Sequence, residues 1–286
     1  MPSLLDLRRR IRSVHNTEQI TKAMKTVSTA KFKKAQRKVV EGRPQWHEEP
    51  SLLARLSAWT GASAHPLFAV RREARAHVVI VTSDKGLCGA FNSNLLARAA
   101  ELIAEKSKSC DVRLVLVGKK AVNHFKRHPA GIERTIPDRT DKLARSETDA
   151  LARELVKKFV FQETDGVYLV YNEFKSILAP KITITRLLPI VPDPAAEPAP
   201  APEWEPGIPA MLETLVPRYI EEQIAHALAE SQAAEQAARM MAMDNASKNA
   251  EELIEDLVLV MNKIRQAGIT KELLEIMTAV EALNKG

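Results

Sequence analysis

The sequence predicts an α/β protein in which two long terminal helices form an antiparallel coiled coil beside a central α/β domain. Three observations predict this fold. Residues 211–286 keep helical periodicity with one internal proline and one glycine before the final residue. Residues 3–41 follow a heptad repeat, and strand and helix patterns alternate between residues 76 and 190, which is typical of a mostly parallel sheet.

The N-terminal heptad repeat has side chains that become smaller along the helix. Its seam is Leu7, Val14, Thr21, Ser28 and Ala35. Small residues let two helix backbones approach closely. The C-terminal segment 230–250 also has small side chains, because it is rich in alanine. We therefore expect these segments to pair. Gly42 and Pro44 predict that the first helix bends or ends there, with a second helical piece over 45–59.

The C-terminal segment carries two neighbouring apolar stripes after its alanine-rich part. One repeats at the coiled-coil spacing of about 3.5 residues and consists of Leu253, Leu257, Val260, Ile264 and Ala267; the other is Ile254, Val258 and Met261. At about 1.5 Å per residue this helix would be roughly 110 Å long, so it would be longer than the N-terminal helix that pairs with it. It should therefore extend beyond that partner from about Asp256, and a further protein chain would have to cover it.

The central region reads as four strands and three helices. The strands are expected over 77–82, 112–117, 166–174 and 181–187, and the helices over 93–106, 119–126 and 146–161. Ser146 and Asp149 stand in the positions of a capping box. The alternation predicts βαβ units and a Rossmann-like domain. The domain organisation is therefore 1–60 N-terminal helix, 76–190 α/β domain, 191–209 proline-rich connector and 210–286 C-terminal helix.

The formal net charge of +6 is unevenly distributed. Residues 1–41 hold eleven basic and three acidic residues, whereas residues 211–260 hold three basic and ten acidic ones. Opposite charge on two helices steers their pairing and register more than it stabilises them. A basic N-terminal segment is also typical of nucleic-acid binding, which stays open as an alternative.

Catalytic and ligand-binding patterns are weak. The turn 83–90 follows a strand but lacks the GxGxxG spacing, and Gly118-Lys119-Lys120 lacks the remaining P-loop residues. Cys88 and Cys110 have no metal-ligand spacing. No run of 18 apolar residues predicts a membrane span, and the first residues lack the apolar core of a secretory signal. We expect no catalytic residue, no cofactor and no metal site.

Three separate motifs resemble one family. IRSVHNTEQITKAMKTVSTAKFKKAQ at 11–36, TSDKGLCGAFNSNL at 82–95 and the segment 230–277, with LVPRYIEEQ before it at 215–223, look like landmarks of the gamma subunit of rotary (F-type) ATP synthases of bacterial type. The resemblance implies that the helix pair is a rotor shaft inside a hexamer of three alpha and three beta subunits. The α/β domain would be its foot, beside the epsilon subunit on a membrane rotor ring.

The family's function and location are implied in the same way. Proton or sodium flow would turn the ring and shaft, and the shaft would drive ATP synthesis on the beta subunits without being catalytic itself. The chain would be a peripheral protein at the cytoplasmic face of the bacterial plasma membrane, touching the membrane only through the ring and binding no nucleic acid.

The motifs also imply contact residues. Arg265 and Gln266 match the family's RQA motif, which binds a beta-subunit loop, and Thr270 and Glu275 match positions just after it. Lys22, Met24 and Lys25 match the ITKAM segment, which faces the acidic lever region of beta. Trp204 and Glu205 resemble the segment near the ring and epsilon.

The sequence departs from the family pattern near its C-terminus. Met261-Asn-Lys-Ile264 replaces the usual Tyr-Asn-Lys-Ala, and Met277-Thr-Ala-Val280 replaces a glycine-rich run; both changes concern how the tip would contact the hexamer, not the role of the chain.

The alternatives to this family are a coiled-coil adaptor with a Rossmann-like domain, a nucleic-acid-binding protein and a nucleotide-dependent enzyme.

Overall fold

The computed structural model describes residues 3–60, 65–136, 145–177, 180–191 and 207–284. Contacts divide the chain into two compact units, one of residues 28–239 and one of residues 1–27 with 240–286. Two long helices, α1 (Leu4–Thr60) and α5 (Ile208–Asn284), contribute to both units. Among the helices in these ranges, none is long and apolar enough to cross a membrane.

The unit of residues 28–239 contains a five-stranded sheet with the order β3-β2-β1-β4-β5. Its strands are β1 (Arg75–Val81), β2 (Asp111–Val117), β3 (Gly131–Ile136), β4 (Gly166–Glu173) and β5 (Lys181–Leu188). The first four are parallel, and β5 is antiparallel to β4. This arrangement confirms the predicted mostly parallel sheet.

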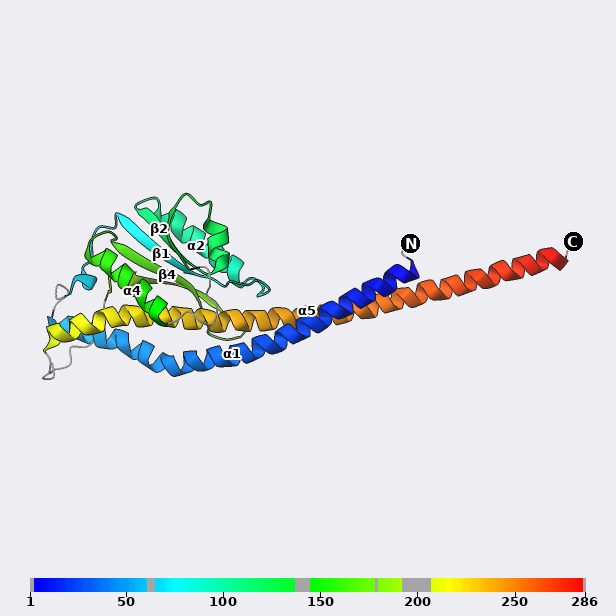
Figure 1. Cartoon of the computed structure of the whole chain (residues 1–286), viewed down its shortest axis with the longest axis horizontal. Coiled ribbons are helices and arrows are strands. Elements are labelled where there is room, and N and C mark those ends of the chain that lie inside the picture. The colour runs from blue at the N-terminus through cyan, green and yellow to red at the C-terminus, as the bar shows by residue number, and fades with distance from the viewer. Residues whose placement is uncertain (1–2, 61–64, 137–144, 178–179, 192–206, 285–286) are drawn as a thin grey trace. The chain divides into compact units, whose positions relative to one another are not determined.

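Helices cover both faces of the sheet (Figure 1). Alternate residues of β1 separate the two layers: Val78 and Ile80 pack with α2 (Phe91–Lys106) and α3 (Lys119–Phe125), whereas Val79 and Val81 pack with α4 (Arg145–Val160) and α5. A short 3₁₀ helix, η1 (Pro66–Phe68), joins the second layer.

The long helix α5 is part of the core of this domain. Its buried residues recur every four positions, which places them on one helix face: Leu212, Val216, Ile220 and Ile224. Further along, α5 presents Ala233, Ala234 and Ala237 to Phe32, Ala35 and Val39 of α1. The alanine-rich segment therefore forms the expected contact between the two helices.

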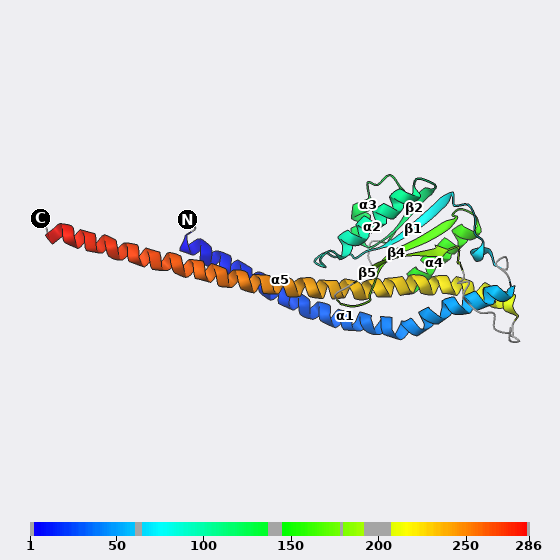
Figure 2. The ribbon, with the colours of Figure 1, turned by 180° about the vertical axis from the view of Figure 1, so that it is seen from behind.

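The helix α1 bends along its course but does not end at Pro44 (Figure 2). Packing of the next turn supports its continuation. Trp46 is buried and stacks on His226 of α5 with ring centroids 4.3 Å apart. The Trp46 ring also lies over Gly42, where a Cβ would come within 2.4 Å of it. Gly42 therefore accommodates Trp46, and of the two expected outcomes the helix bends and continues as α1 rather than ending.

Two details of the α/β domain differ from the sequence-based expectations. The strand β3 was not predicted, because it lies at the sheet edge and its residues are only half-buried or exposed. The helix α4 begins at Arg145, so Ser146 lies inside its first turn and is exposed. The predicted capping box at Ser146 was therefore wrong.

Candidate coupling surface of the two long helices

In the unit of residues 1–27 and 240–286, polar contacts fix the antiparallel register of α1 and α5. The hydroxyl groups of Thr21 and Ser247 lie 2.7 Å apart and are buried. Lys22 pairs with Glu251 at 2.6 Å, and Lys25 pairs with Asp244 at 2.6 Å. The opposite charges of the two helices therefore meet, as the uneven charge distribution predicted.

These ion pairs shift the ionisation of their members. The hydrogen bond from Lys22 lowers the pKa of Glu18, and the hydrogen bonds to Glu18 and Glu251 raise the pKa of Lys22. Hydrogen bonds from Lys25 and then Lys248 lower the pKa of Asp244. The groups are therefore charged at neutral pH. The side chains of Lys22 and Lys25 are 53% and 46% exposed, so a carboxylate of another chain can still reach each ammonium group.

The end of α5 has an exposed apolar surface. Leu257 is its last buried residue, and every described residue from Arg265 to Val280 is exposed. Six large apolar residues of this stretch are 51–68% exposed: Ile269, Leu273, Leu274, Ile276, Met277 and Val280. The continuous exposed part therefore starts near Arg265, whereas between Asp256 and Ile264 exposed residues such as Leu259 alternate with partly buried ones such as Val258 and Met261.

The predicted contact residues of α5 lie together at the start of this surface. Arg265 and Gln266 are exposed, and the Thr270 hydroxyl donates to the Gln266 carbonyl at 3.0 Å. Glu275 forms an exposed ion pair with Lys271 at 3.6 Å. Their side chains are thus accessible over about three helical turns. We call the whole exposed stretch, residues 265–280, the α5 tip.

The other predicted residues are placed as follows. Met24 on α1 is half-buried beside the ion-paired Lys22 and Lys25. Trp204 and Glu205 lie outside the described residues.

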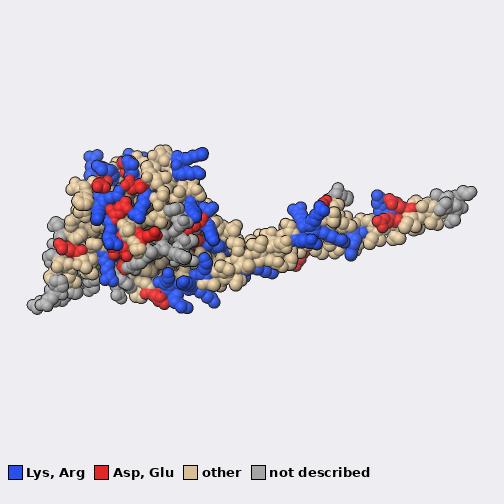
Figure 3. Space-filling model, in the orientation of Figure 1, with Lys and Arg blue, Asp and Glu red and all other residues tan. Residues whose placement is uncertain are grey.

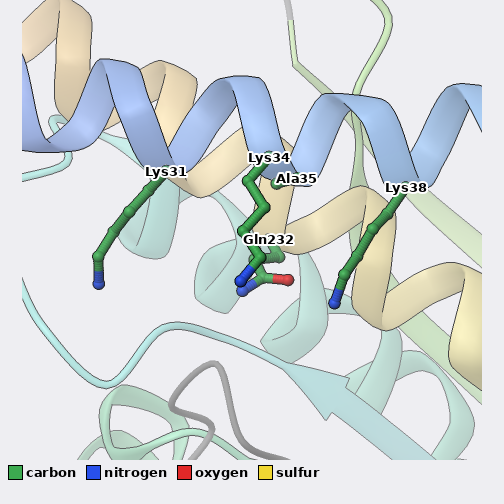
Figure 4. A pocket seen from close by; sticks show the side chains of 5 residues that line it. All are labelled: Lys31, Lys34, Ala35, Lys38 and Gln232. Atoms are coloured by element: carbon green, nitrogen blue, oxygen red, sulfur yellow. The ribbon is translucent and has the colours of Figure 1, made fainter.

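Basic side chains also gather on α1. Four arginines near its start are exposed: Arg8, Arg9, Arg10 and Arg12. Lysine and arginine side chains gather at this end of α1 in Figure 3. In the unit of residues 28–239, Lys31, Lys34 and Lys38 line a shallow pocket with Ala35 and with Gln232 of α5 (Figure 4). Sequence reasoning counted these lysines without recognising a site, although their spacing of three and four residues places them on one helix face.

Side chains that follow β1 accept hydrogen bonds from the first N–H groups of α3. Asp84, after β1, accepts a hydrogen bond from the Lys119 N–H at 3.1 Å, and Thr82 Oγ1 accepts one from the Ala121 N–H at 2.9 Å. Both N–H groups belong to the start of α3. In the described part of the chain, no three His, Cys, Asp or Glu residues form a group that could hold a metal.

An antiparallel pair of long helices with an accessible apolar tip is typical of a protein that acts through contacts with other chains. The comparisons with known proteins specify the family. A family model described as ATP synthase matches residues 3–283. The ATP synthase gamma chain of Pelotomaculum thermopropionicum is 42% identical over 285 residues, 99% of this chain and 100% of that relative. That of Solibacter usitatus is 44% identical over 287 residues, 99% of each chain. The chain belongs to the ATP synthase gamma chain family.

Solved structures agree with this assignment. The chain has a TM-score of 0.61 and 25% identity to a central-stalk chain of the Tetrahymena thermophila mitochondrial ATP synthase, covering 80% of this chain and 99% of that one. A chain of the Euglena gracilis mitochondrial ATP synthase has a TM-score of 0.70 and 22% identity over 99% of this chain and 95% of that one, and shares the fold. As a gamma chain, the protein is a non-catalytic subunit of the central stalk.

Proposed function

We propose that this chain couples rotation of an ion-driven membrane ring to conformational change in a hexamer of three alpha and three beta subunits. The observation that carries the proposal is the α5 tip, whose large apolar side chains are half or more exposed. Exposed apolar side chains grouped on one element are typical of surfaces that another protein covers. A surrounding hexamer would supply that cover.

The α5 tip offers specific polar contacts as well. Arg265 would pair with a carboxylate on a beta-subunit loop, because an enclosed arginine needs a charged partner. The side-chain amide of Gln266 would bind the same loop, since Thr270 uses only the Gln266 backbone carbonyl. The exposed Lys271–Glu275 pair contributes little to stability, so Glu275 can exchange Lys271 for a partner's group.

The basic residues of α1 would meet the acidic lever region of beta. Lys22 and Lys25 are already paired within the chain but remain about half exposed, and Met24 would add an adaptable apolar contact. The lysine pocket of Lys31, Lys34 and Lys38 would provide a further contact for acidic side chains.

The mechanism follows from the asymmetry of the two helices. The helix pair has different side chains on its different faces, so it would present a different surface to each of the three catalytic sites. Each rotation of about 120° would therefore stabilise a different conformation at each site, as a ligand with differential affinity does. The α/β domain would act as the foot on the ring beside epsilon, near Trp204 and Glu205. The protein would lie at the cytoplasmic face of the plasma membrane, and the coupling ion would be a proton or sodium.

The experiment reconstitutes the chain with the alpha and beta subunits of the same synthase and observes a probe on the α/β domain during ATP hydrolysis. Stepwise rotation supports the proposal, whereas assembly without rotation supports the adaptor alternative. Arg265→Ala removes a charge-assisted contact of about 1.5–3 kcal/mol, so coupled ATP synthesis should fall about tenfold or more. Lys263→Ala, which removes a nearby exposed positive charge, is the matched control. Normal synthesis in Arg265→Ala would contradict the proposed contact.

A further inference from the structure

The order of the strands marks a place where α/β sheets usually bind a ligand. From β1 the chain proceeds to β2 and β3 on one side and later to β4 and β5 on the other. In open parallel sheets, ligands bind beside the carboxyl ends of the strands at which this direction changes. In this chain that place lies after β1 and β4, and side chains of the two long helices occupy it.

Both backbone groups of Phe174, the residue after β4, are bound there. The Phe174 N–H donates to Glu230 Oε2 of α5 at 2.9 Å, and the Phe174 carbonyl accepts from Arg43 Nη2 of α1 at 2.6 Å. Arg43 Nε donates in turn to Glu230 Oε1 at 3.2 Å. One carboxylate and one guanidinium therefore connect β4, α1 and α5.

The turn after β1 is bound in a similar way. Arg239 of α5 donates to the carbonyl oxygens of Lys85 and Gly86 at 3.3–3.4 Å, and it pairs with Glu235 at 2.8 Å. We use the name polar joint for Arg43, Phe174, Glu230 and Arg239. Its two halves lie more than two helical turns apart along α5, so they bind the sheet at two points.

Because the charged side chains of Glu230 and Arg239 in the polar joint are buried, each of them needs hydrogen-bond partners within the chain. Glu230 is 1% exposed and Arg239 is 7% exposed. Burial is the largest influence on the pKa of Glu230 and opposes ionisation, but hydrogen bonds from His226, Arg43 and the Phe174 N–H outweigh it and lower the pKa. The carboxylate is therefore charged in the folded protein, and removing its partners would leave a costly buried charge.

The polar joint constrains motions that the apolar contacts resist poorly. Hydrophobic packing of Leu212, Val216 and Ile220 against the sheet holds α5 to the domain but has no preferred direction. Hydrogen bonds weaken steeply when their angles change, so the polar joint opposes rotation and sliding of α5 against the sheet. We infer that Arg43, Glu230 and Arg239 are positioning residues through which torque passes between the α/β domain and the helix pair; this rests on the proposed rotor function.

The test uses the assembled synthase in vesicles, with Glu230→Gln as the variant and Glu213→Gln, an exposed acidic residue of α5, as the matched control. Amide hydrogen exchange at Phe174 should become about tenfold or more faster in Glu230→Gln, because the joint opens more often. Angular fluctuations of a probe on the α/β domain, with the hexamer immobilised and nucleotide absent, should broaden. Fewer ions should be pumped per ATP hydrolysed. Glu213→Gln should change none of these.

The conservative variant Arg43→Lys keeps the charge but loses the simultaneous bonds to Glu230 and Phe174, so its values should be intermediate. If the Glu230→Gln chain does not assemble into the synthase, the same three measurements on Arg43→Lys test the inference. Faster exchange at Phe174 with unchanged fluctuations and pumping would overturn the inference, and so would unchanged exchange. Failure of the unsubstituted chain to rotate would instead refute the proposed function, so the two failures are distinguishable.

Discussion

Removal of residues 269–286 should weaken binding of the chain to the alpha–beta hexamer without lowering the free energy of unfolding of the chain itself. The six large apolar residues of the α5 tip are 51–68% exposed in the single chain. Complete burial of such a side chain contributes about 1.5–3 kcal/mol relative to full exposure, so covering the exposed half would contribute about 1 kcal/mol each. The sum, about 5–6 kcal/mol, corresponds to about 10⁴-fold in affinity before the freedom of motion lost on association is subtracted.

The same truncation should leave the α/β domain unaffected. No residue described between 269 and 280 is buried within the chain, so the free energy of unfolding should change by less than about 0.5 kcal/mol. The assays are urea unfolding of the isolated chain and titration of the alpha–beta hexamer. A variant that keeps the helix length but carries Leu273→Gln, Leu274→Gln and Met277→Gln separates the apolar contribution from length. Full affinity in both variants would refute the reasoning.

Three further outcomes are expected. Gly42→Ala should destabilise the chain by about 1–3 kcal/mol in urea unfolding, because the new Cβ would come within 2.4 Å of the Trp46 ring. Gly268→Ala, where no atom lies within 4 Å, should instead stabilise its helix by about 0.5–1 kcal/mol; equal effects at the two glycines would contradict the packing argument. Burial lowers the pKa of His77, so its imidazole binds a proton more readily in the unfolded chain than in the folded one. The contribution of His77 to the free energy of unfolding should therefore be complete above about pH 6.5 and decrease below it. His77→Gln should reduce that decrease. An identical pH dependence in His77→Gln would exclude His77 as its source.

Periodicity in the sequence was sufficient to predict the long helices and four of the five strands. Buried strands such as β1 and β4 each contain a run of apolar residues, and this pattern identifies them. The strand β3, Gly-Ile-Glu-Arg-Thr-Ile, has no such run, because an edge strand has little buried surface. The continuation of α1 past Pro44 depends on the stacking of Trp46 on His226, which are distant in sequence.

The polar joint shows the same limit more clearly. Glu230 and Arg239 stand in a segment that the sequence marks as helical and alanine-rich. Nothing in that pattern indicates that Glu230 reaches the backbone of Phe174, because the contact joins three elements far apart in the chain. The uncovered end of α5 was predicted from the unequal lengths of the two helices and its contact residues from a motif, and their contacts with beta stay a prediction.

The carboxylate of Asp84 at the start of α3 has a consequence for how the domain responds to its surroundings. Phosphate groups approaching these N–H groups would meet a negative charge that already accepts one of their hydrogen bonds. The N–H group of Lys119 is therefore unavailable to a phosphate oxygen as long as Asp84 accepts from it.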